Sequence, residues 1–267
     1  MKRVEAVIFD WAGTTVDHGS LAPVRAVTEL FRQHGIPLTD EDARKDMGIF
    51  KRDHIRNVLA MPHVSQRWRD LTGNTPNEQD VSKLFSDFLP LQMSILGDYS
   101  QVIQGVPALA EKLRSRGLRI GSTTGYTRPM LDVLVQHAKA QGFHCDRALC
   151  PDDAPGGRPH PWMCLQLAIH FCLSATWTAV KIGDTVSDVE EALNAGMWAV
   201  GVTATGNEIG LSESDLAALP QEERCLRIES ARHHLTSAGA HYVVDSAACC
   251  EPVLEEIDSR LAAGDRP

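Results

Sequence analysis

The chain has 267 residues, of which 43% are hydrophobic and 23% are charged, and its formal net charge at pH 7 is −9. These values are typical of a soluble globular protein with a sizeable core, and they exclude a mainly disordered chain. The acidic balance argues against electrostatic binding of nucleic acid, because such binding uses an excess of lysine and arginine.

Neither a secretion signal nor a membrane span is evident. The N-terminal MKRVEAVIFD leads directly into a strand pattern and is too short to hold the apolar core of a signal peptide. No apolar run approaches the roughly 18 residues that a membrane-spanning helix needs. The seven cysteines show no CxxC pair or zinc-ligand spacing. We therefore expect a cytoplasmic protein with free thiols and no membrane contact.

Short apolar runs that alternate with helical patterns predict a parallel sheet. Val4 to Phe9 is rich in β-branched residues, as in strands that are buried on both faces. Further strands are predicted at 118–121, 178–182, 198–203 and 241–244, with helices at 106–116, 189–195, 212–219, 221–237 and up to about 262. The alternation predicts an α/β fold with a doubly wound, Rossmann-like parallel sheet.

The long stretch after the first strand contains helical patterns and no strand pattern. Apolar spacing predicts helices at 23–34, 51–61, 64–71 and 78–96. An insertion at this point would lie over the carboxyl ends of the strands, where open α/β sheets bind their ligands. The sequence therefore predicts a discontinuous α/β core domain of residues 1–19 and 100–267, and a helical cap domain of residues 20–99.

Two of the predicted strands lead into carboxylates. Asp10 follows the first strand, and Asp184 follows the strand at 178–182, with Asp188 four residues later. Parallel strands end at one edge of a sheet, so these carboxylates would meet, and a hard cation such as Mg²⁺ would make that arrangement tolerable. Helix capping is the alternative for Asp184 and Ser187, because both precede a helix. We favour capping for Ser187 and a functional role for Asp184.

The patterns D-x-x-G-T-T after the first strand and G-D-x-x-x-D after the later one resemble the first and last motifs of the haloacid dehalogenase superfamily. The resemblance implies that Asp10 attacks phosphorus and forms an aspartyl-phosphate, and that Asp184 is a magnesium ligand with Asp188 as its indirect companion. Residues 122–126, STTGY, resemble the second motif, which implies that Thr124 and Gly125 hold a phosphoryl oxygen.

Two local alternatives accompany this second motif. Residues 123–125 would also suit a turn that caps a helix without binding any ligand. The expected helix start at Arg128-Pro129 favours anion binding nearby, because a helix N-terminus presents free amides.

Position 12 departs from the superfamily's phosphatases, which carry there an aspartate that protonates the leaving oxygen. Ala12 removes that acid, at a cost of about 10² to 10⁴ in rate for a phosphomonoester. A carbon leaving group instead needs an electron sink, which an imine between a lysine and a substrate aldehyde supplies. Lys51, at the start of a predicted helix with His54 on the same face, is the candidate, although alone it would suit an exposed helix lysine.

Five blocks between Asp10 and Asp188 together resemble the phosphonatase (phosphonoacetaldehyde hydrolase) family: DWAGTTVD, MGIFKRDHIR, GSTTGYTR, GRPHPWM and KIGDTVSD. The resemblance implies that Mg²⁺ is held by Asp10, the backbone carbonyl of Ala12 and Asp184. It also implies that Lys51 forms a Schiff base with the aldehyde of phosphonoacetaldehyde.

The same resemblance implies substrate contacts for four further residues. Arg158 stands where many superfamily phosphatases place a lysine that balances the charge of the phosphoryl group, and a surface loop arginine is the alternative. Met47, Tyr126 and His54 are matched to positions near the imine, although His54 would also suit a polar helix residue.

The implied function is hydrolysis of phosphonoacetaldehyde to acetaldehyde and phosphate in 2-aminoethylphosphonate degradation. The family also implies a homodimer that contacts through the cap, although the apolar cap helices are equally compatible with an internal core of the cap. The partner is a small-molecule phosphonate. The alternatives are a phosphomonoesterase or phosphosugar mutase of the same superfamily with an aberrant first motif, or a non-catalytic phosphate-binding module.

Overall fold

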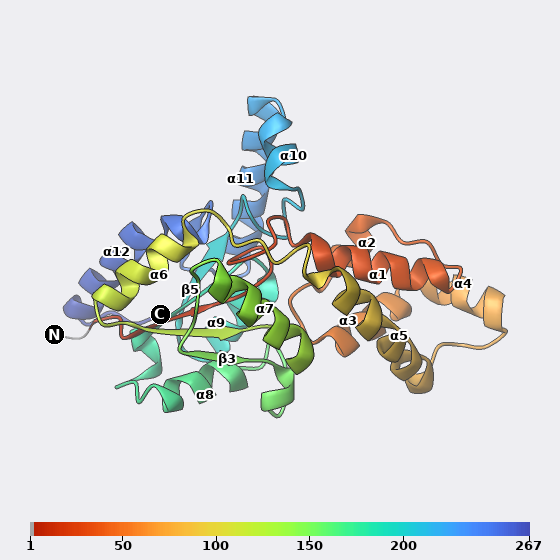
Figure 1. The fold of residues 1–267 in the computed structure, drawn as a ribbon, viewed down its shortest axis with the longest axis horizontal. Helices are drawn as coiled ribbons and strands as arrows, with labels where there is room; N and C mark the ends of the chain where they lie inside the picture. The colour runs from red at the N-terminus through yellow and green to blue at the C-terminus, as the bar shows by residue number, and fades with distance from the viewer. Residues whose placement is uncertain (1–2) are drawn as a thin grey trace.

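The computed structural model describes residues 3–267, whose strands form a six-stranded parallel sheet (Figure 1). The strands are β1 (Ala6–Phe9), β2 (Arg119–Thr123), β3 (Arg147–Leu149), β4 (Ala179–Gly183), β5 (Trp198–Val202) and β6 (Tyr242–Val244). They lie in the order β3-β2-β1-β4-β5-β6, and every pairing is parallel. β1 is therefore central, with Phe9 opposite Ser122 of β2 and Ile182 of β4.

Helices cover both faces of this sheet. Val7 and Phe9 of β1 belong to one apolar cluster and Ala6 and Ile8 to another, because successive side chains of a strand point to opposite faces. The first face is covered by α6 (Val106–Ser115), α7 (Arg128–Ala140) and α12 (Glu251–Ala263), and the second by α8 (Trp162–His170), α9 (Val186–Asn194) and α11 (Gln221–Ser237). The predicted fold class, a doubly wound α/β sheet with an inserted helical segment, is confirmed.

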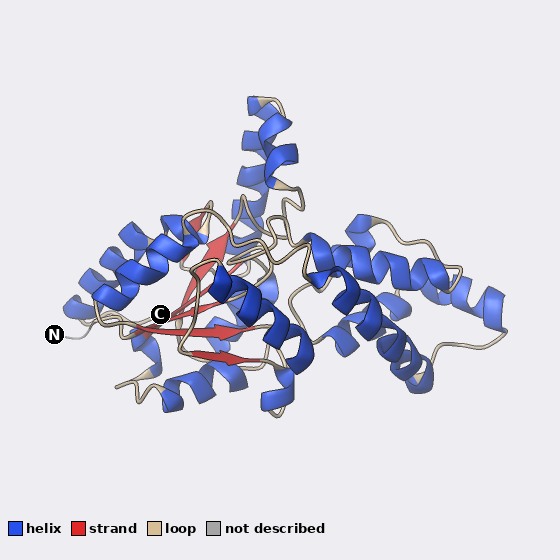
Figure 2. Ribbon diagram, in the orientation of Figure 1, coloured by secondary structure: helices blue, strands red, loops and turns tan. Residues whose placement is uncertain are grey.

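The chain between β1 and α6 forms helices only. They are α1 (Leu21–Gln33), α2 (Asp40–Arg44), α3 (Lys51–Ala60), α4 (Pro62–Thr72) and α5 (Glu78–Leu96). α5 packs against α1 and α3, and Phe31, Leu59 and Phe88 are buried between them. We call α1 to α5 the cap helices; Figure 2 shows them beyond the tips of the strand arrows. The division of the chain into domains at residues 20 and 99 stays a prediction.

Three short elements escape the sequence prediction. β3 has three residues at the sheet edge and buries only Leu149 fully, so it lacks a clear apolar run. α2 is a five-residue turn begun by a capping box from Thr39. α8 carries apolar residues around most of its surface, with Gln166 and His170 as its polar positions, so it has no clear helical periodicity. α10 (Glu213–Ala218) and the first turns of α11 project away from the sheet (Figure 1), whereas the last turns of α11 pack on β5 and β6.

Two expectations about the whole chain have structural counterparts. None of the helices within residues 3–267 is both long and apolar enough to span a membrane. The cysteines are all free, and Cys150, Cys164 and Cys250 are buried, which agrees with the expectation of unpaired thiols.

Candidate active site

Asp10 and Asp184 meet because the two paired strands that precede them end at the same edge. The Asp10 amide continues the ladder by donating to the Ile182 carbonyl at 2.9 Å. Carboxylate oxygens of Asp10, Asp184 and Asp188 all lie within 4.8 Å of one another. Gly13 allows this approach: its φ is +82°, and a Cβ at this position would lie 2.1 Å from Asp184 Oδ2.

The burial of Asp10 and Asp184 side by side favours the binding of a cation. Burial raises the pKa of both Asp10 and Asp184, and the neighbouring carboxylates add to the rise. Asp184 accepts hydrogen bonds from Thr14 Oγ1 at 3.2 Å and the Asn207 amide at 2.8 Å, both of which are neutral donors. The capping alternative for Asp184 is wrong, because neither donor belongs to α9. The Asp184 oxygens, which accept from these neutral donors, therefore suit a hard divalent cation beside Asp10.

Asp188 differs from these two carboxylates because cations of the protein already pair with it. Lys181 Nζ lies 2.5 Å and Arg158 Nη1 lies 2.8 Å from Asp188 Oδ1. Burial alone would raise the pKa of Asp188, but the charges of Arg158 and Lys181 outweigh burial and hold it below its usual value. Asp188 therefore contributes little net charge toward a metal, in keeping with the indirect role expected for it.

The expectation that Ser187 caps the helix is wrong. Thr185 is the N-cap of α9, and its Oγ1 accepts from the Asp188 amide in a capping box. Ser187 Oγ instead donates to the backbone carbonyl of Met47 at 3.0 Å. Ser187 thus ties the loop before α3 to the core, and no pattern in the sequence indicates this long-range contact.

Arg158 is buried beside Asp10, so the alternative of a surface arginine is wrong. Its Nη1 lies 2.7 Å from Asp10 Oδ1. Nε donates to Glu191 Oε2 at 2.9 Å, and Nη2 donates to Thr123 Oγ1 at 2.8 Å. These contacts fix the guanidinium plane and direct one nitrogen at Asp10. No role was expected from the sequence for Glu191, Thr123 or Lys181, although a charged residue within an otherwise apolar strand, as at Lys181, indicates a buried ionic partner.

Thr124 and Gly125 follow β2 and lie where the cap reaches the core. Thr124 is buried, and its Oγ1 accepts from the Tyr126 amide at 3.2 Å. Thr124 therefore stabilises the turn after β2, in addition to any role in binding a ligand. A Cβ at Gly125 would lie 2.2 Å from the Ile49 carbonyl, so glycine is needed for the cap loop to approach. The Arg128 amide donates to Asp152 Oδ2 at 2.7 Å; this amide of α7 is therefore already satisfied by the protein.

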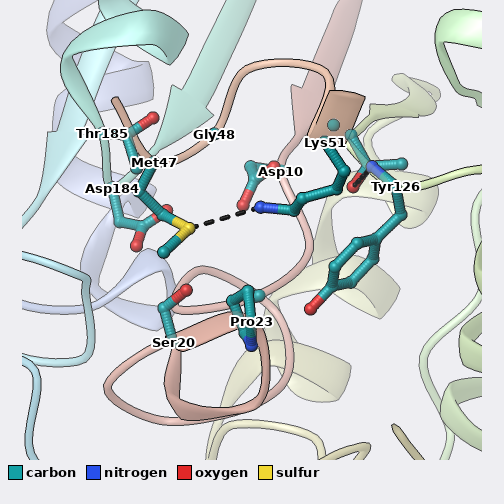
Figure 3. Close-up of a pocket in the computed structure, with 12 residues that line it drawn as sticks. Asp10, Ser20, Pro23, Met47, Gly48, Lys51, Tyr126, Asp184 and Thr185 are labelled. Carbon is teal, nitrogen blue, oxygen red and sulfur yellow. Dashed lines mark hydrogen bonds between the residues drawn. The ribbon is translucent and has the colours of Figure 1, made fainter. Parts of the chain in front are cut away.

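Lys51 is the first residue of α3 and enters the site from the cap side (Figure 3). Only 3% of Lys51 is exposed, so the alternative of a surface lysine is wrong. Its Nζ lies 3.3 Å from Met47 Sδ and 5.6 Å from the centre of the Tyr126 ring. Burial lowers the Lys51 pKa to about 8; the Arg158 charge adds to that effect, while Asp10 and Asp184 oppose it.

His54 and Tyr126 are buried close to this amine. Burial and the Lys51 charge lower the His54 pKa to about 3, while the Ala43 and Lys45 backbones act against this shift. Neither ring nitrogen of His54 completes a hydrogen bond, and the same holds for the Tyr126 hydroxyl. Burial raises the Tyr126 pKa well above its usual value. Both side chains are therefore neutral.

One cavity joins most of these groups. It is lined by Asp10, Ala12, Ser20, Pro23, Met47, Gly48, Lys51, Thr124, Gly125, Tyr126, Asp184 and Thr185. Of the residues singled out from the sequence, Arg158 and His54 stand behind the lining, next to Asp10 and Lys51 respectively. Ser20 and Pro23, at the start of α1, were not anticipated. Figure 3 shows the Lys51 amine directed into the space between Met47 and Asp10.

Comparison with known proteins agrees with this arrangement. The family model described as "haloacid dehalogenase-like hydrolase" matches residues 4–196. A phosphonoacetaldehyde hydrolase of Paraburkholderia phytofirmans is 45% identical over the full length of both chains. One from Nitratidesulfovibrio vulgaris is 44% identical over 99% of this chain and 94% of its own.

Solved structures extend the likeness to three dimensions. The crystal structure of a phosphonoacetaldehyde hydrolase-like protein from Oleispira antarctica is 41% identical, with a TM-score of 0.97 over 99% of this chain and 96% of that one. A β-phosphoglucomutase from Clostridium difficile is 17% identical, with a TM-score of 0.68 over 97% of this chain and 99% of its own, and shares the fold alone. The chain therefore belongs to the haloacid dehalogenase-like hydrolases and, among them, to the phosphonoacetaldehyde hydrolase family.

Proposed function

We propose that this protein hydrolyses the carbon–phosphorus bond of phosphonoacetaldehyde to acetaldehyde and inorganic phosphate. The observation that carries the proposal is a buried lysine, Lys51, in the same cavity as the carboxylate of Asp10, with Ala12 where an oxygen leaving group would need an acid. Two relatives that carry this name match 99% and 100% of the chain at 44% and 45% identity.

Lys51 is suited to imine formation because its amine is partly neutral. With a pKa of about 8, roughly a tenth of the amine is neutral at pH 7, against roughly one part in three thousand at the ordinary value. The neutral amine adds to the aldehyde carbon, and loss of water gives a protonated imine. Met47 and Tyr126 surround the amine with weakly polar atoms that preserve the low pKa.

Asp10 then attacks phosphorus while the electrons of the carbon–phosphorus bond move into the imine, which becomes an enamine on Lys51. Arg158 holds Asp10 Oδ1 through Nη1, which keeps the nucleophile oriented and offsets the negative charge that gathers there. Thr124 and Gly125 hold the phosphoryl oxygens at the end of β2. The phosphoryl group is now on the Asp10 carboxylate.

The remaining steps restore both residues. Protonation of the enamine carbon and hydrolysis of the imine release acetaldehyde and free Lys51, and a second water cleaves the aspartyl-phosphate to phosphate and Asp10. His54 is neutral and next to Lys51, and we propose that it exchanges protons with the amine during these steps. One water is released and two are consumed, so the net reaction uses one.

The metal proposed for this site is Mg²⁺, held by Asp10, Asp184 and the backbone carbonyl of Ala12, with water completing the oxygen ligands. When bound, it would offset the charges of the two carboxylates and of the phosphonate, so that the carboxylate of Asp10 can approach the phosphonate. Activity is expected to disappear on treatment with EDTA and to return when Mg²⁺ is added back.

A substrate panel tests the proposal against its nearest rival. Phosphonoacetaldehyde should be turned over at least about 10² faster than simple phosphomonoesters such as p-nitrophenyl phosphate, since Ala12 offers no proton to an ester oxygen. Equal or faster turnover of the esters would identify a phosphomonoesterase. Absence of turnover on the whole panel, with Mg²⁺ present, would instead favour a binding module.

Three further features complete the proposal. We place the enzyme in the cytoplasm and in 2-aminoethylphosphonate degradation, since the transamination of that amine would supply the aldehyde. We also propose a homodimer that contacts through the cap helices, where Leu71 and Met93 are exposed apolar residues. Sedimentation equilibrium tests the dimer directly.

A further inference from the structure

A second cationic side chain of the cap helices, besides Lys51, reaches into the core. Arg44 is the last residue of α2, and its guanidinium makes contacts with backbone and amide oxygens only. Nη1 lies 3.0 Å from the Gly19 carbonyl and 3.1 Å from Asn207 Oδ1, and Nη2 lies 3.1 Å from the Gly210 carbonyl. Within residues 3–267, Arg44 forms no ion pair with a carboxylate.

These acceptors come from two different parts of the molecule. Gly19 and Ser20, whose carbonyl is 3.5 Å from Nη1, belong to the segment that connects β1 to α1. Asn207 and Gly210 belong to the loop that follows β5, in the α/β core. Arg44 therefore joins a cap helix, the connection into the cap and a core loop at a single point, and it does so with charge-assisted hydrogen bonds.

The core loop is shaped to receive this guanidinium. Gly210 has φ +65°, and a Cβ there would lie 2.6 Å from Arg44 Cζ. Gly19 has φ +86°, and a Cβ there would lie 2.2 Å from the Leu211 carbonyl, so the two loops are in close contact. The Gly19 amide also donates to the Thr205 carbonyl at 2.7 Å. Larger residues at either glycine would displace the loops or the guanidinium.

The same loop contacts a carboxylate of the active site. The Asn207 amide donates to Asp184 Oδ2 at 2.8 Å, while the Asn207 side chain and carbonyl accept from Arg44. A Cβ at Gly206 would lie 2.6 Å from the Asp184 Cβ, so this loop packs directly on Asp184. Groups behind a metal ligand that fix its orientation typically change metal affinity when they are lost.

We infer that Arg44 is a positioning residue that latches the cap helices onto the 205–210 loop, and that through Asn207 it holds Asp184 in place for the metal. Docking of the cap, which carries Lys51, and orientation of a metal carboxylate are thereby linked by one side chain. The kinetic part of this inference rests on the proposed function, whereas the metal-binding part does not.

The test compares Arg44→Met with the wild type and with Arg32→Met, a matched loss of a cap arginine whose exposed partner is Glu29. Mg²⁺ binding by calorimetry, without substrate, should weaken about ten-fold in Arg44→Met. With phosphonoacetaldehyde, KM should rise and kcat should fall, each about ten-fold, because misplaced groups lose near-attack geometry. Arg32→Met should match the wild type in all three quantities.

Circular dichroism and thermal melting separate positioning from folding. A role in stability alone would lower the melting temperature and leave the Mg²⁺ affinity and KM of the folded variant within about two-fold of wild type, which would overturn the inference. If Arg44→Met does not fold, Arg44→Lys decides the question. Lysine keeps the charge but lacks the planar guanidinium, so Mg²⁺ affinity, KM and kcat should change in the same directions but by smaller factors. Wild-type values of these quantities would contradict the positioning role of Arg44.

If the wild type does not cleave phosphonoacetaldehyde, the proposed function fails and the calorimetric comparison still decides the role of Arg44. If the wild type cleaves it and Arg44→Met binds Mg²⁺ normally with unchanged kinetics, the function stands and the latch fails. The two failures are therefore distinguishable.

Discussion

Arg158 and Asp10 form a buried ion pair, with 2.7 Å between Nη1 and Oδ1. The pair is part of a larger network, because the same arginine also contacts Asp188 and Glu191. Two buried cations, Arg158 and Lys181, thus compensate a group of carboxylates that could not otherwise be buried together. The network holds the carboxylate of Asp10, the proposed nucleophile, before any ligand binds.

Arg158→Ala should therefore damage both stability and activity. It leaves buried carboxylates without their cation, at a cost of about 3–5 kcal/mol in the free energy of unfolding. Urea denaturation measures this cost, and kcat/KM should fall below detection. Arg227→Ala, which removes an exposed pair with Glu223, is the control and should cost at most about 1 kcal/mol. Equal stability of the two variants would contradict the role given to the network.

The pH dependence of the reaction should follow Lys51. The neutral amine is the nucleophile toward the aldehyde, so kcat/KM should rise with pH and level off near a pH of about 8, the pKa of this amine. An ordinary lysine would give a rise that continues beyond pH 10. Initial rates between pH 6 and pH 9 at saturating Mg²⁺ check this, and a profile that is flat over that range would speak against Lys51 as the nucleophilic amine.

Lys51 should also destabilise the fold, with a characteristic pH dependence. Its folded pKa of about 8 is below the unfolded value of 10.5, so the burial cost is fully present below pH 8 and disappears as pH rises to 10.5. Lys51→Met should therefore be more stable than wild type at pH 7, by up to about 3 kcal/mol. Urea denaturation without added metal should show that advantage reduced by more than half at pH 9.5. A less stable Lys51→Met at pH 7 would refute the prediction.

Gly125→Ala tests the contact between cap and core without touching a charged group. Its new Cβ would meet the Ile49 carbonyl at 2.2 Å, which forces the loop that carries Lys51 away from Asp10. A shift of about 1 Å should lower kcat/KM by about 10². Gly97→Ala is the matched control, because its Cβ would meet only His137 Cε1, at 3.6 Å; its kinetics should be unchanged. Similar kinetics in both variants would show that the contact is unimportant.

How much of this site could be predicted differs from residue to residue. Asp10 and Asp184 were predictable, because two buried strand patterns ended in carboxylates and parallel strands share an edge. The burial of Lys51 was not, since a helical pattern gives the face of a residue but not what covers it. The family resemblance and the missing acid at Ala12 suggested the role of Lys51. The position of Lys51 at the contact between cap and core explains its burial.

Contacts between distant segments account for what the sequence could not show. Ser187 suited a helix cap locally, yet Thr185 occupies that position and Ser187 bonds the Met47 carbonyl. The contacts of Arg44 could not be predicted from the sequence, because its acceptors are mainly backbone oxygens, which any residue can offer. The edge strand β3 could not be predicted because it has only three residues, of which Leu149 alone is buried, and these carry too little pattern.

The central claim is that Lys51 forms an imine with the substrate, and the most direct measurement is reduction with borohydride followed by peptide mass mapping. With phosphonoacetaldehyde present, turnover should be lost and the mass of the Lys51 peptide should increase by an ethyl or phosphonoethyl group. Without substrate, or in Lys51→Arg, no such increase is expected, and Lys51→Arg should retain less than about one part in 10³ of wild-type activity. Normal turnover by Lys51→Arg, or reduction that leaves Lys51 unmodified during turnover, would contradict the account.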